Sequence, residues 1–259
     1  MSTWDPASYG TFLDLRTRPS VDLVQRIEFT VPDRIVDLGC GPGNSTRLCR
    51  DRWPAAAIQG LDSSPEMIAS ARAGYPLGDW RGYDIGEWVW RTQDDAPDLI
   101  LSCAALQWIG DHDTLFPRLL RRLASGGVLA AHMPDYEAVP NRLMRELAAD
   151  SRWRRWFPEG AALGWRSHPL EFYYSVLAAD ANSLELWATD YLWIMPDVQG
   201  IIEWYLSTGL RPFLHRIEAN VEREAFLSEY AQQLASFYPR SKAGGVPFTM
   251  RRIFLIART

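Results

Sequence analysis

The sequence has few of the basic residues that would point to a nucleic-acid partner. It contains a single lysine, Lys242, and its 27 lysine and arginine side chains are outnumbered by 32 acidic ones, which gives a net charge of −5. Binding to nucleic acid requires a basic surface that displaces counterions from the phosphates. The composition therefore argues against nucleic acid as a partner.

Cysteine and long apolar runs are also scarce. The three cysteines, at positions 40, 49 and 103, form no Cys-x-x-Cys pair and have no histidine at ligand spacing. This favours free thiols over a disulfide framework or a metal site. No apolar run reaches the ~18 residues of a membrane span, and the first residues lack the basic and apolar parts of a secretion signal. We expect a cytoplasmic protein with no metal and no membrane attachment.

What the sequence does contain is an alternation of short apolar runs with helical patterns. Its 259 residues, 47% of them hydrophobic, are enough for one domain with insertions. This alternation predicts a parallel sheet with helices on both faces. The runs typical of buried strands are 34–38, 57–61, 98–103 and 127–133, with a weaker one before Asp84. Residues 115–123 predict a crossover helix capped by Asp111 or Asp113 and stopped by Gly126 and Gly127.

The pattern changes after Met133. Residues 137–157 are Arg-rich and predict a helix that buries Trp153 and Trp156. Further on, the patterns predict a strand over 184–194, a helix over 199–207, a buried helix face with Phe226, Tyr230, Leu234 and Phe237, and a closing strand from Arg252. We interpret residues 134–165 and 196–248 as insertions that roof one side of a single sheet.

Residues 34–46 join an apolar strand to a glycine-rich turn and the start of a helix. The glycines at 39, 41 and 43 permit positive φ angles and close approach of the backbone to a ligand. A dinucleotide fingerprint would have glycine at position 44, where this chain has Asn44. Asp37 directs a negative charge at the turn, which suits the cationic S-adenosylmethionine better than a phosphate. Residues 44–46 are candidate caps of the helix that follows.

The ends of the other predicted strands complete a nucleoside site. Asp62 ends the second strand, where its carboxylate can accept both ribose hydroxyls, and Ser64 and Pro65 start the next helix. We expect Asp84 to accept from the adenine amino group and the Ile85 N–H to meet a ring nitrogen. Ligands of open α/β sheets bind outside the carboxyl ends of the strands. Residues 102–108 and 132–136 should therefore line the methionine arm and the methyl acceptor.

Motifs along nearly the whole chain resemble the trans-aconitate 2-methyltransferase family, within the class I S-adenosylmethionine-dependent methyltransferases. The resemblance implies a doubly wound, mostly parallel, seven-stranded Rossmann-like sheet, and a lid over residues 1–30 that carries Tyr9 and Arg18. It also implies O-methylation of a carboxylate on a small polycarboxylic acid. The motifs are Trp4-Asp-Pro, Tyr9, Arg18-Pro, Asp37 to Thr46, Asp62 to Met67, Ala105 to Trp108, Leu115-Phe-Pro, Met133-Pro-Asp, Gly209-Leu-Arg-Pro and the closing Arg-x-Phe run.

Departures from the family pattern cluster where the acceptor should lie. His132 and Tyr136 flank Met-Pro-Asp where the family has Gln and Asn, and Asn141-Arg142 replaces a Ser-His pair. Tyr191-Leu-Trp-Ile-Met replaces a Tyr-x-His-Gln-Met segment. A larger or less polar carboxylic acid therefore stays open as the acceptor, as does a macromolecule.

The expected contacts follow from these motifs and from the chemistry of the acceptor. A carboxylate is ionised at pH 7 and needs no general base, so proximity and exclusion of water should drive the transfer and no catalytic residue is expected. The predicted cofactor contacts are Asp37, Gly39, Cys40, Gly41, Gly43, Asn44, Asp62, Ser63, Met67, Asp84, Ile85, Cys103, Ala104 and Trp108. The predicted substrate contacts are Tyr9, Arg18, Gln107, Trp108, His132, Tyr136, Arg142, Tyr191, Trp193, Arg211 and Arg252.

Overall fold

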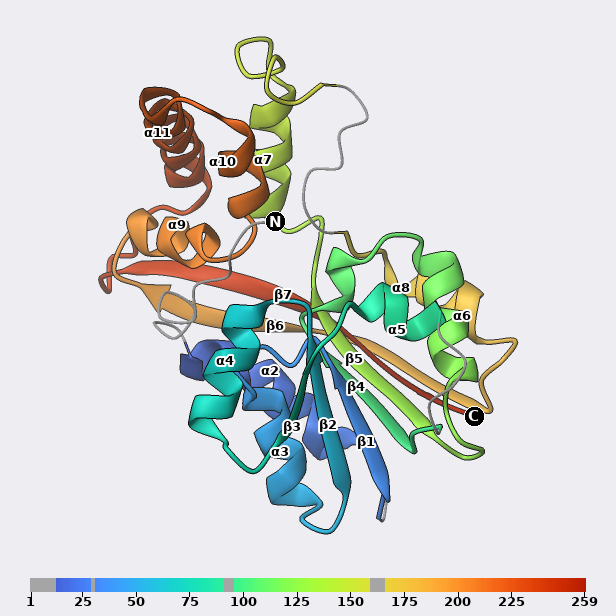
Figure 1. The fold of residues 1–259 in the computed structure, drawn as a ribbon. Helices are drawn as coiled ribbons and strands as arrows, with labels where there is room; N and C mark the ends of the chain where they lie inside the picture. The colour runs from blue at the N-terminus through green and yellow to red at the C-terminus, as the bar shows by residue number, and fades with distance from the viewer. Residues whose placement is uncertain (1–12, 29–30, 91–95, 159–165) are drawn as a thin grey trace. The chain divides into compact units, whose positions relative to one another are not determined.

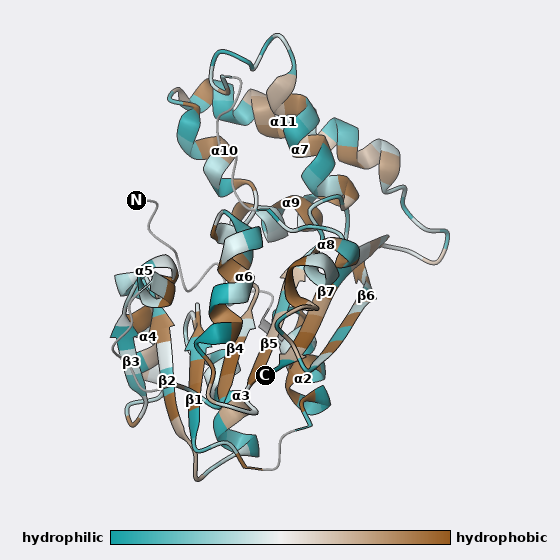
Figure 2. Cartoon of the chain, turned by 90° about the vertical axis from the view of Figure 1, so that its right-hand side faces the viewer, coloured by the Kyte–Doolittle hydropathy of each residue, from teal (hydrophilic) through white to brown (hydrophobic). Residues whose placement is uncertain are grey.

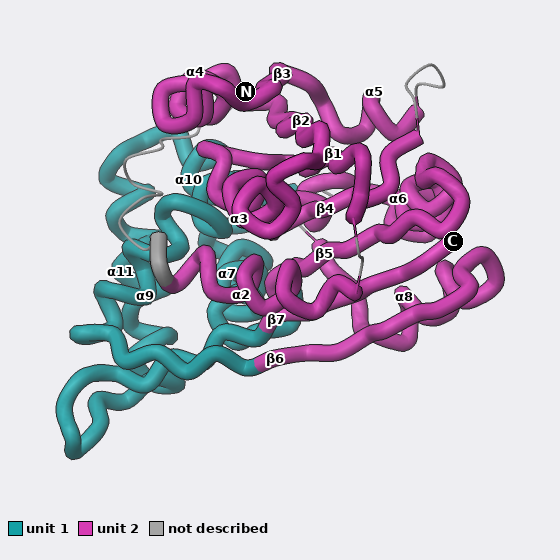
Figure 3. The backbone as a smooth tube through the Cα atoms, turned by 90° about the horizontal axis from the view of Figure 1, so that it is seen from below, with its two compact units in different colours: residues 1–2, 135–165, 190–251 teal, residues 3–134, 166–189, 252–259 magenta. Residues whose placement is uncertain are grey.

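The computed structural model describes residues 13–28, 31–90, 96–158 and 166–259 (Figure 1). Residues 1–12 of the predicted lid, which include Tyr9, lie outside this range, as do residues 29 and 30. The chain divides into two compact units (Figure 3). Unit 2 comprises residues 3–134, 166–189 and 252–259, and unit 1 comprises residues 1–2, 135–165 and 190–251. The two segments that we interpreted as insertions, 134–165 and 196–248, thus belong almost entirely to unit 1.

The sheet has seven strands in the order β3-β2-β1-β4-β5-β7-β6. Strands β1 to β5 run parallel, and β7 is antiparallel to β5, which confirms the predicted mostly parallel Rossmann-like sheet. The strands are β1 (Arg34–Leu38), β2 (Ala57–Asp62), β3 (Asp79–Gly82), β4 (Leu99–Cys103), β5 (Val128–Pro134), β6 (Ser183–Met195) and β7 (Val246–Arg258). Strands β6 and β7 continue from unit 2 into unit 1.

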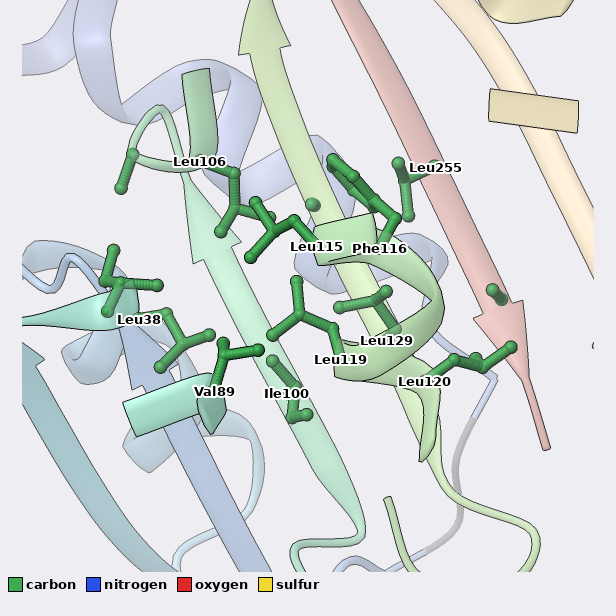
Figure 4. Close-up of a cluster of buried hydrophobic side chains, with 14 of the residues drawn as sticks. Leu38, Val89, Ile100, Leu106, Leu115, Phe116, Leu119, Leu120, Leu129 and Leu255 are labelled. Atoms are coloured by element: carbon green, nitrogen blue, oxygen red, sulfur yellow. The ribbon is translucent and has the colours of Figure 1, made fainter. Parts of the chain in front are cut away.

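The helices of unit 2 cover both faces of its sheet. They are α2 (Leu13–Arg26), α3 (Asn44–Arg52), α4 (Pro65–Gly74), α5 (Ile85–Trp90), the 3-10 turn η1 (Leu106–Trp108), α6 (His112–Arg121) and α8 (Leu170–Leu177). Helices α5, α6 and α8 bury one face in a large apolar cluster, which includes Ile100, Phe116 and Leu129 (Figure 4). Strand β5 is buried along nearly its whole length, and Figure 2 shows β4 and β5 as largely hydrophobic. Burial on both faces is typical of a central parallel strand.

Helix α2 packs against the opposite face of the sheet. Leu23 and Ile27 are completely buried, and α2 contacts α3 and β5. The described part of the predicted lid is therefore an integral layer of unit 2. This face of the sheet also carries Asp37 and His132, because their side chains alternate with those that face the apolar cluster.

Unit 1 contains helices α7 (Val139–Ala149), α9 (Val198–Leu206), α10 (Arg211–Arg216) and α11 (Asn220–Phe237). Its aromatic core joins Trp153 to Phe226, with ring centroids 5.1 Å apart, and the Tyr230 hydroxyl donates to the Pro140 carbonyl at 3.1 Å. Phe226, Tyr230 and Leu234 share a buried face as predicted, and Trp153 is buried. The prediction was wrong for Phe237, which is 49% exposed at the end of α11.

Two predicted helix boundaries also need correction. The helix predicted over 137–157 spans Val139–Ala149, and residues 151–156 form turns. Trp153 is buried although it lies in the turns after the helix end. The pattern of Arg and Trp therefore did not indicate a helix over these residues. Helix α6 ends at Arg121, well before Gly126, and the Asp111 side chain makes no capping hydrogen bond.

Candidate active site

The glycine-rich turn between β1 and α3 can be built only with glycine at its tightest point. Gly39 has φ +72°, and a Cβ atom there would lie 2.1 Å from the Cβ of Ala105. The N–H groups of Gly39 and Cys40 donate to the Leu61 carbonyl at 2.8 and 2.9 Å. The turn is therefore held against the end of β2, as a backbone cradle for a ligand requires.

The predicted capping role of residues 44–46 was wrong. The N-cap of α3 is Gly43, at φ 95°, and no side chain caps this helix. The hydroxyls of Ser45 and Thr46 instead donate to Asp37 Oδ2, each at 2.6 Å. Ser45 and Thr46 lie in the first turn of α3, and their hydroxyls donate to the buried carboxylate because an ionised acceptor forms stronger hydrogen bonds than a neutral one.

Asp37 lies beneath the turn as a fully buried carboxylate. Burial raises its pKa from 3.8 to about 6, against the lowering effect of the two hydroxyl donors. Its second oxygen, Oδ1, is buried without a hydrogen-bond partner among the described residues. A buried carboxylate with one unsatisfied oxygen favours a cationic neighbour.

Asp62, at the end of β2, meets the same turn from the other side. Its Oδ2 accepts from the Gly41 N–H at 2.9 Å, and its Oδ1 accepts from the Ser64 N–H at 2.8 Å. Burial raises the pKa of this carboxyl, and the two backbone donors oppose the rise. Each oxygen keeps a further lone pair, so the fixed carboxylate can still accept from two hydroxyl groups of a ligand.

The neighbouring helix starts conform to the sequence prediction. Ser64 caps α4, where its hydroxyl accepts from the Met67 N–H, and Pro65 occupies the first turn. Ser63 is exposed and the Met67 side chain is buried. The Tyr83 N–H donates to the Asp62 carbonyl, which joins the ends of β2 and β3. Asp84 is exposed and accepts from the Glu87 N–H at 3.0 Å, while Ile85 is buried at the start of α5.

A pocket within unit 2 opens between the glycine-rich turn, the ends of β4 and β5, and helix α2. Parallel pairing sets Cys103 beside His132, two residues beyond the pair of Leu101 and Ala130. Seven predicted residues meet there, namely Gly39, Cys40, Gly41, Asn44, Cys103, Ala104 and His132. The pocket is also lined by Arg16, Thr17, Ser20, Pro42 and Ser45, which the sequence analysis did not assign to it.

His132 joins helix α2 to the sheet at this pocket. Its Nε2 lies 3.1 Å from the Ser20 hydroxyl, and the side chain is 2% exposed. Burial, with a smaller contribution from the nearby Arg252 guanidinium, holds the pKa of His132 well below its usual value. His132 is therefore a neutral hydrogen-bonding group at neutral pH.

The turn after β4 is strained where it borders the pocket. Ala104 has φ 56°, in the left-handed region that non-glycine residues rarely adopt. Its N–H donates to the His132 carbonyl at 2.9 Å, and its carbonyl accepts from Gln107 Nε2 at 2.6 Å. The Gln107 side chain is thus buried and bound to its own turn, and Trp108 is half-buried. Neither of these residues is among those that line the pocket.

The arginine that reaches the pocket from α2 is Arg16, not Arg18. Arg16 is 8% exposed, whereas the Arg18 side chain is 66% exposed and forms an ion pair with Asp22 at 3.0 Å. Residues two apart on a helix point in different directions, so only one of them can face the sheet. Arg16 and Ser20 lie four residues apart on one helix face, but Arg18 and Asp22 have the same spacing, so the sequence carries no signal that singles out Arg16.

Five predicted substrate contacts belong to unit 1. Arg142 pairs with Glu146 at 3.4 Å, and Tyr136 lies under the Arg145 guanidinium. Trp193 packs on Tyr191, Trp204 and Phe248, so it contributes to the aromatic core of unit 1. Arg211 begins α10 and is half-buried. Arg252, in unit 2, is 6% exposed.

Neither a metal site nor a membrane span is found in the described part of the chain. No three His, Cys, Asp or Glu side chains gather there in a way that could hold a metal ion. Among the same residues, no helix is long and apolar enough to cross a bilayer.

A family model described as methyltransferase domain matches residues 12–188. Together with the mostly parallel sheet, this match identifies the chain as a methyltransferase of the Rossmann-like class. The fold is similar to that of the YcgJ protein from Bacillus subtilis, with a TM-score of 0.60 at 14% identity, covering 93% of this chain and 98% of that one. It is also similar to phosphoethanolamine N-methyltransferase 2 from Haemonchus contortus, solved with S-adenosylmethionine, with a TM-score of 0.54 at 17% identity, covering 93% and 52% of the chains.

A closer relationship follows from sequence. The chain is 44% identical to the trans-aconitate 2-methyltransferase of Acidovorax ebreus strain TPSY, over 100% of this chain and 99% of that protein. This chain therefore belongs to the trans-aconitate 2-methyltransferase family.

Proposed function

We propose that this protein transfers a methyl group from S-adenosylmethionine to a carboxylate of trans-aconitate or a closely related small polycarboxylic acid. The observation that carries the proposal is the 44% identity to a trans-aconitate 2-methyltransferase over the full length of both chains. The geometry of unit 2 supports the cofactor half of the reaction, since the turn, the carboxylates and the pocket lie in one unit.

The residues at the glycine-rich turn fit S-adenosylmethionine. Gly39 lets the backbone of the turn pack directly against Ala105, and Asp62 is fixed by two backbone donors with lone pairs to spare for ribose hydroxyls. Asp37 supplies a buried negative charge below the turn. A sulfonium compound with an ammonium group and no phosphate matches this charge pattern, whereas a pyrophosphate would be repelled by both carboxylates.

The main task of the protein in this reaction is to position the acceptor against the methyl group. When bound, S-adenosylmethionine supplies an electrophilic methyl group for attack by a carboxylate oxygen. The acceptor is already ionised at neutral pH, so no residue has to remove a proton. The side chains of the site orient the acceptor and exclude water, and His132, neutral and fixed by Ser20, adds hydrogen-bonding capacity without a charge.

We propose that residues 134–165 and 196–248 roof the acceptor site. The chain leaves β5 at Pro134, the carboxyl end of a central strand, and enters unit 1 with the next residue. Ligands of such sheets bind at this end. Arg142, Arg211 and Arg252 remain candidates to bind the non-reacting carboxylates. The apolar character of Trp193 is accounted for by its packing on Trp204 and Phe248, so a less polar acceptor need not be invoked for it.

A panel of acids tests the proposal. The purified protein is incubated with labelled S-adenosylmethionine and separate di- and tricarboxylates, monocarboxylates and hydroxyl compounds, and the products are analysed by mass spectrometry. We expect a monomethyl ester of trans-aconitate or of a close analogue as the preferred product. An Asp62→Ala variant measured in parallel controls for uncatalysed methylation. The proposal fails if no polycarboxylate is esterified while another class of acceptor is.

We propose that the protein acts in the cytoplasm. The three cysteines are free thiols in the structure, as a reducing compartment favours.

A further inference from the structure

The pocket in unit 2 has the charge of an anion site. Of its described lining residues, Arg16 is the one cation, and none is an aspartate or a glutamate. Arg16 is 8% exposed, so its guanidinium acts in surroundings that screen charge poorly. A desolvated guanidinium facing a pocket without carboxylates attracts an anionic group.

The other titratable groups that line the pocket are neutral at pH 7. Burial raises the pKa of the Cys40 and Cys103 thiols. Burial and the Arg252 guanidinium lower the pKa of His132. Arg252 therefore adds positive potential behind His132, while the Asp37 carboxylate adds negative potential beneath the turn and contributes to the raised pKa of both thiols. On the pocket wall itself, the formal charge comes from Arg16.

Hydrogen bonds fix the helix that carries Arg16. Ser20 lies one turn further along α2, on the same face. Its hydroxyl lies 3.1 Å from His132 Nε2 on β5. The helix is thus attached to a central strand at the rim of the pocket, and α2 also contacts α3 and β5, so buried contacts set the position of the guanidinium relative to the turn.

We propose that Arg16 binds a ligand carboxylate in this pocket. The inference rests on the proposed function for the identity of that ligand, because two compounds of the reaction carry the group. One is the methionine part of the cofactor, and the other is the polycarboxylic acid. A guanidinium binds either carboxylate through two parallel hydrogen bonds.

Binding measurements on Arg16→Gln distinguish the two sources. The probes are S-adenosylmethionine, S-adenosylhomocysteine and 5′-methylthioadenosine, which lacks the amino-acid part and its carboxylate. If the cofactor supplies the carboxylate, Arg16→Gln lowers the affinity for S-adenosylmethionine and S-adenosylhomocysteine by about 10- to 100-fold. The affinity for 5′-methylthioadenosine is unchanged. If the acid supplies it, the three dissociation constants are unchanged and KM for trans-aconitate rises by about the same factor.

Two further variants make the test specific. Arg16→Lys should restore only part of the affinity, because an ammonium group lacks the planar fork. Arg26→Gln removes the same charge from the same helix at a side chain that is 53% exposed, and it should change neither affinity nor KM. Thermal unfolding followed by circular dichroism checks that each variant is folded.

The outcomes separate this inference from the proposed function. If folded Arg16→Gln matches the wild type within twofold for all three nucleosides and for KM, Arg16 binds no carboxylate and the inference is wrong. If the wild type methylates no acid but Arg16→Gln still loses cofactor affinity, the inference holds and the proposed acceptor is wrong.

Discussion

The stability of the cofactor-free Asp37→Asn variant relative to the wild type should be greater at pH 8 than at pH 4. The reason is the burial of the Asp37 carboxylate, whose pKa rises from 3.8 to about 6 in the folded chain. Folding of the chain is more favourable when this carboxyl is protonated. Its contribution to stability is complete below the unfolded pKa and is lost as the pH rises through the folded pKa.

The expected size follows from the two pKa values. At 1.36 kcal/mol for each unit, the ionised Asp37 costs the wild type about 3 kcal/mol, and most of that loss falls between about pH 4 and pH 6. Asparagine cannot ionise, so the variant does not lose this stability as the pH rises. The free energy of unfolding of Asp37→Asn minus that of the wild type should therefore rise by about 3 kcal/mol from acid to neutral pH, whatever its value at pH 4.

Urea unfolding followed by tryptophan fluorescence measures this difference at a series of pH values. Asp51→Asn, at a side chain that is 59% exposed, controls for the removal of one carboxylate from the surface. A stability difference for Asp37→Asn that stays constant or falls with rising pH would refute the argument from burial. The same variant should bind S-adenosylmethionine more weakly, because the buried negative charge is what the cationic ligand would neutralise.

Three further predictions concern the site. Asp62→Ala should weaken S-adenosylmethionine binding by about 1.5–3 kcal/mol, the scale of hydrogen bonds to a charged group; unchanged affinity by calorimetry in the folded variant would contradict the ribose assignment. Gly39→Ala should abolish cofactor binding and lower the melting temperature, because the new Cβ would meet the Ala105 Cβ at 2.1 Å with φ at +72°; a variant with normal melting and binding would show that the turn tolerates a side chain. The single-turnover rate at saturating cofactor should vary little between about pH 6.5 and 8.5, since the carboxylate acceptor loses no proton there; a tenfold rise per pH unit would indicate a hydroxyl or amine acceptor.

The Asp111 and Asn44 predictions illustrate a limit of local sequence signals. Both residues stand directly before or at a helix start and have the side chains typical of caps. In the structure Asp111 adopts φ 54° and makes no capping bond, and α3 begins after Gly43. Where a loop is shaped by tertiary contacts, a residue's capping propensity does not decide what its side chain does.

The sequence by itself determined the elements whose signals are local. The order of strands and helices, the glycine-rich turn and the carboxylate that ends β2 all follow from residues within about 30 positions of one another. Apolar periodicity and backbone freedom act over that range. The family motifs then identify the class of cofactor and the kind of acceptor.

Only the tertiary structure decided which polar residues meet at the pocket. Ser20 and His132 are 112 positions apart and lie 3.1 Å from each other, and no periodicity encodes such a pair. Nor does the sequence separate Arg16 from Arg18, since both are arginines on one helix, until the packing of α2 against β5 buries one and leaves the other in solvent. Charge and protonation at the site depend on burial, and burial is a property of the folded chain.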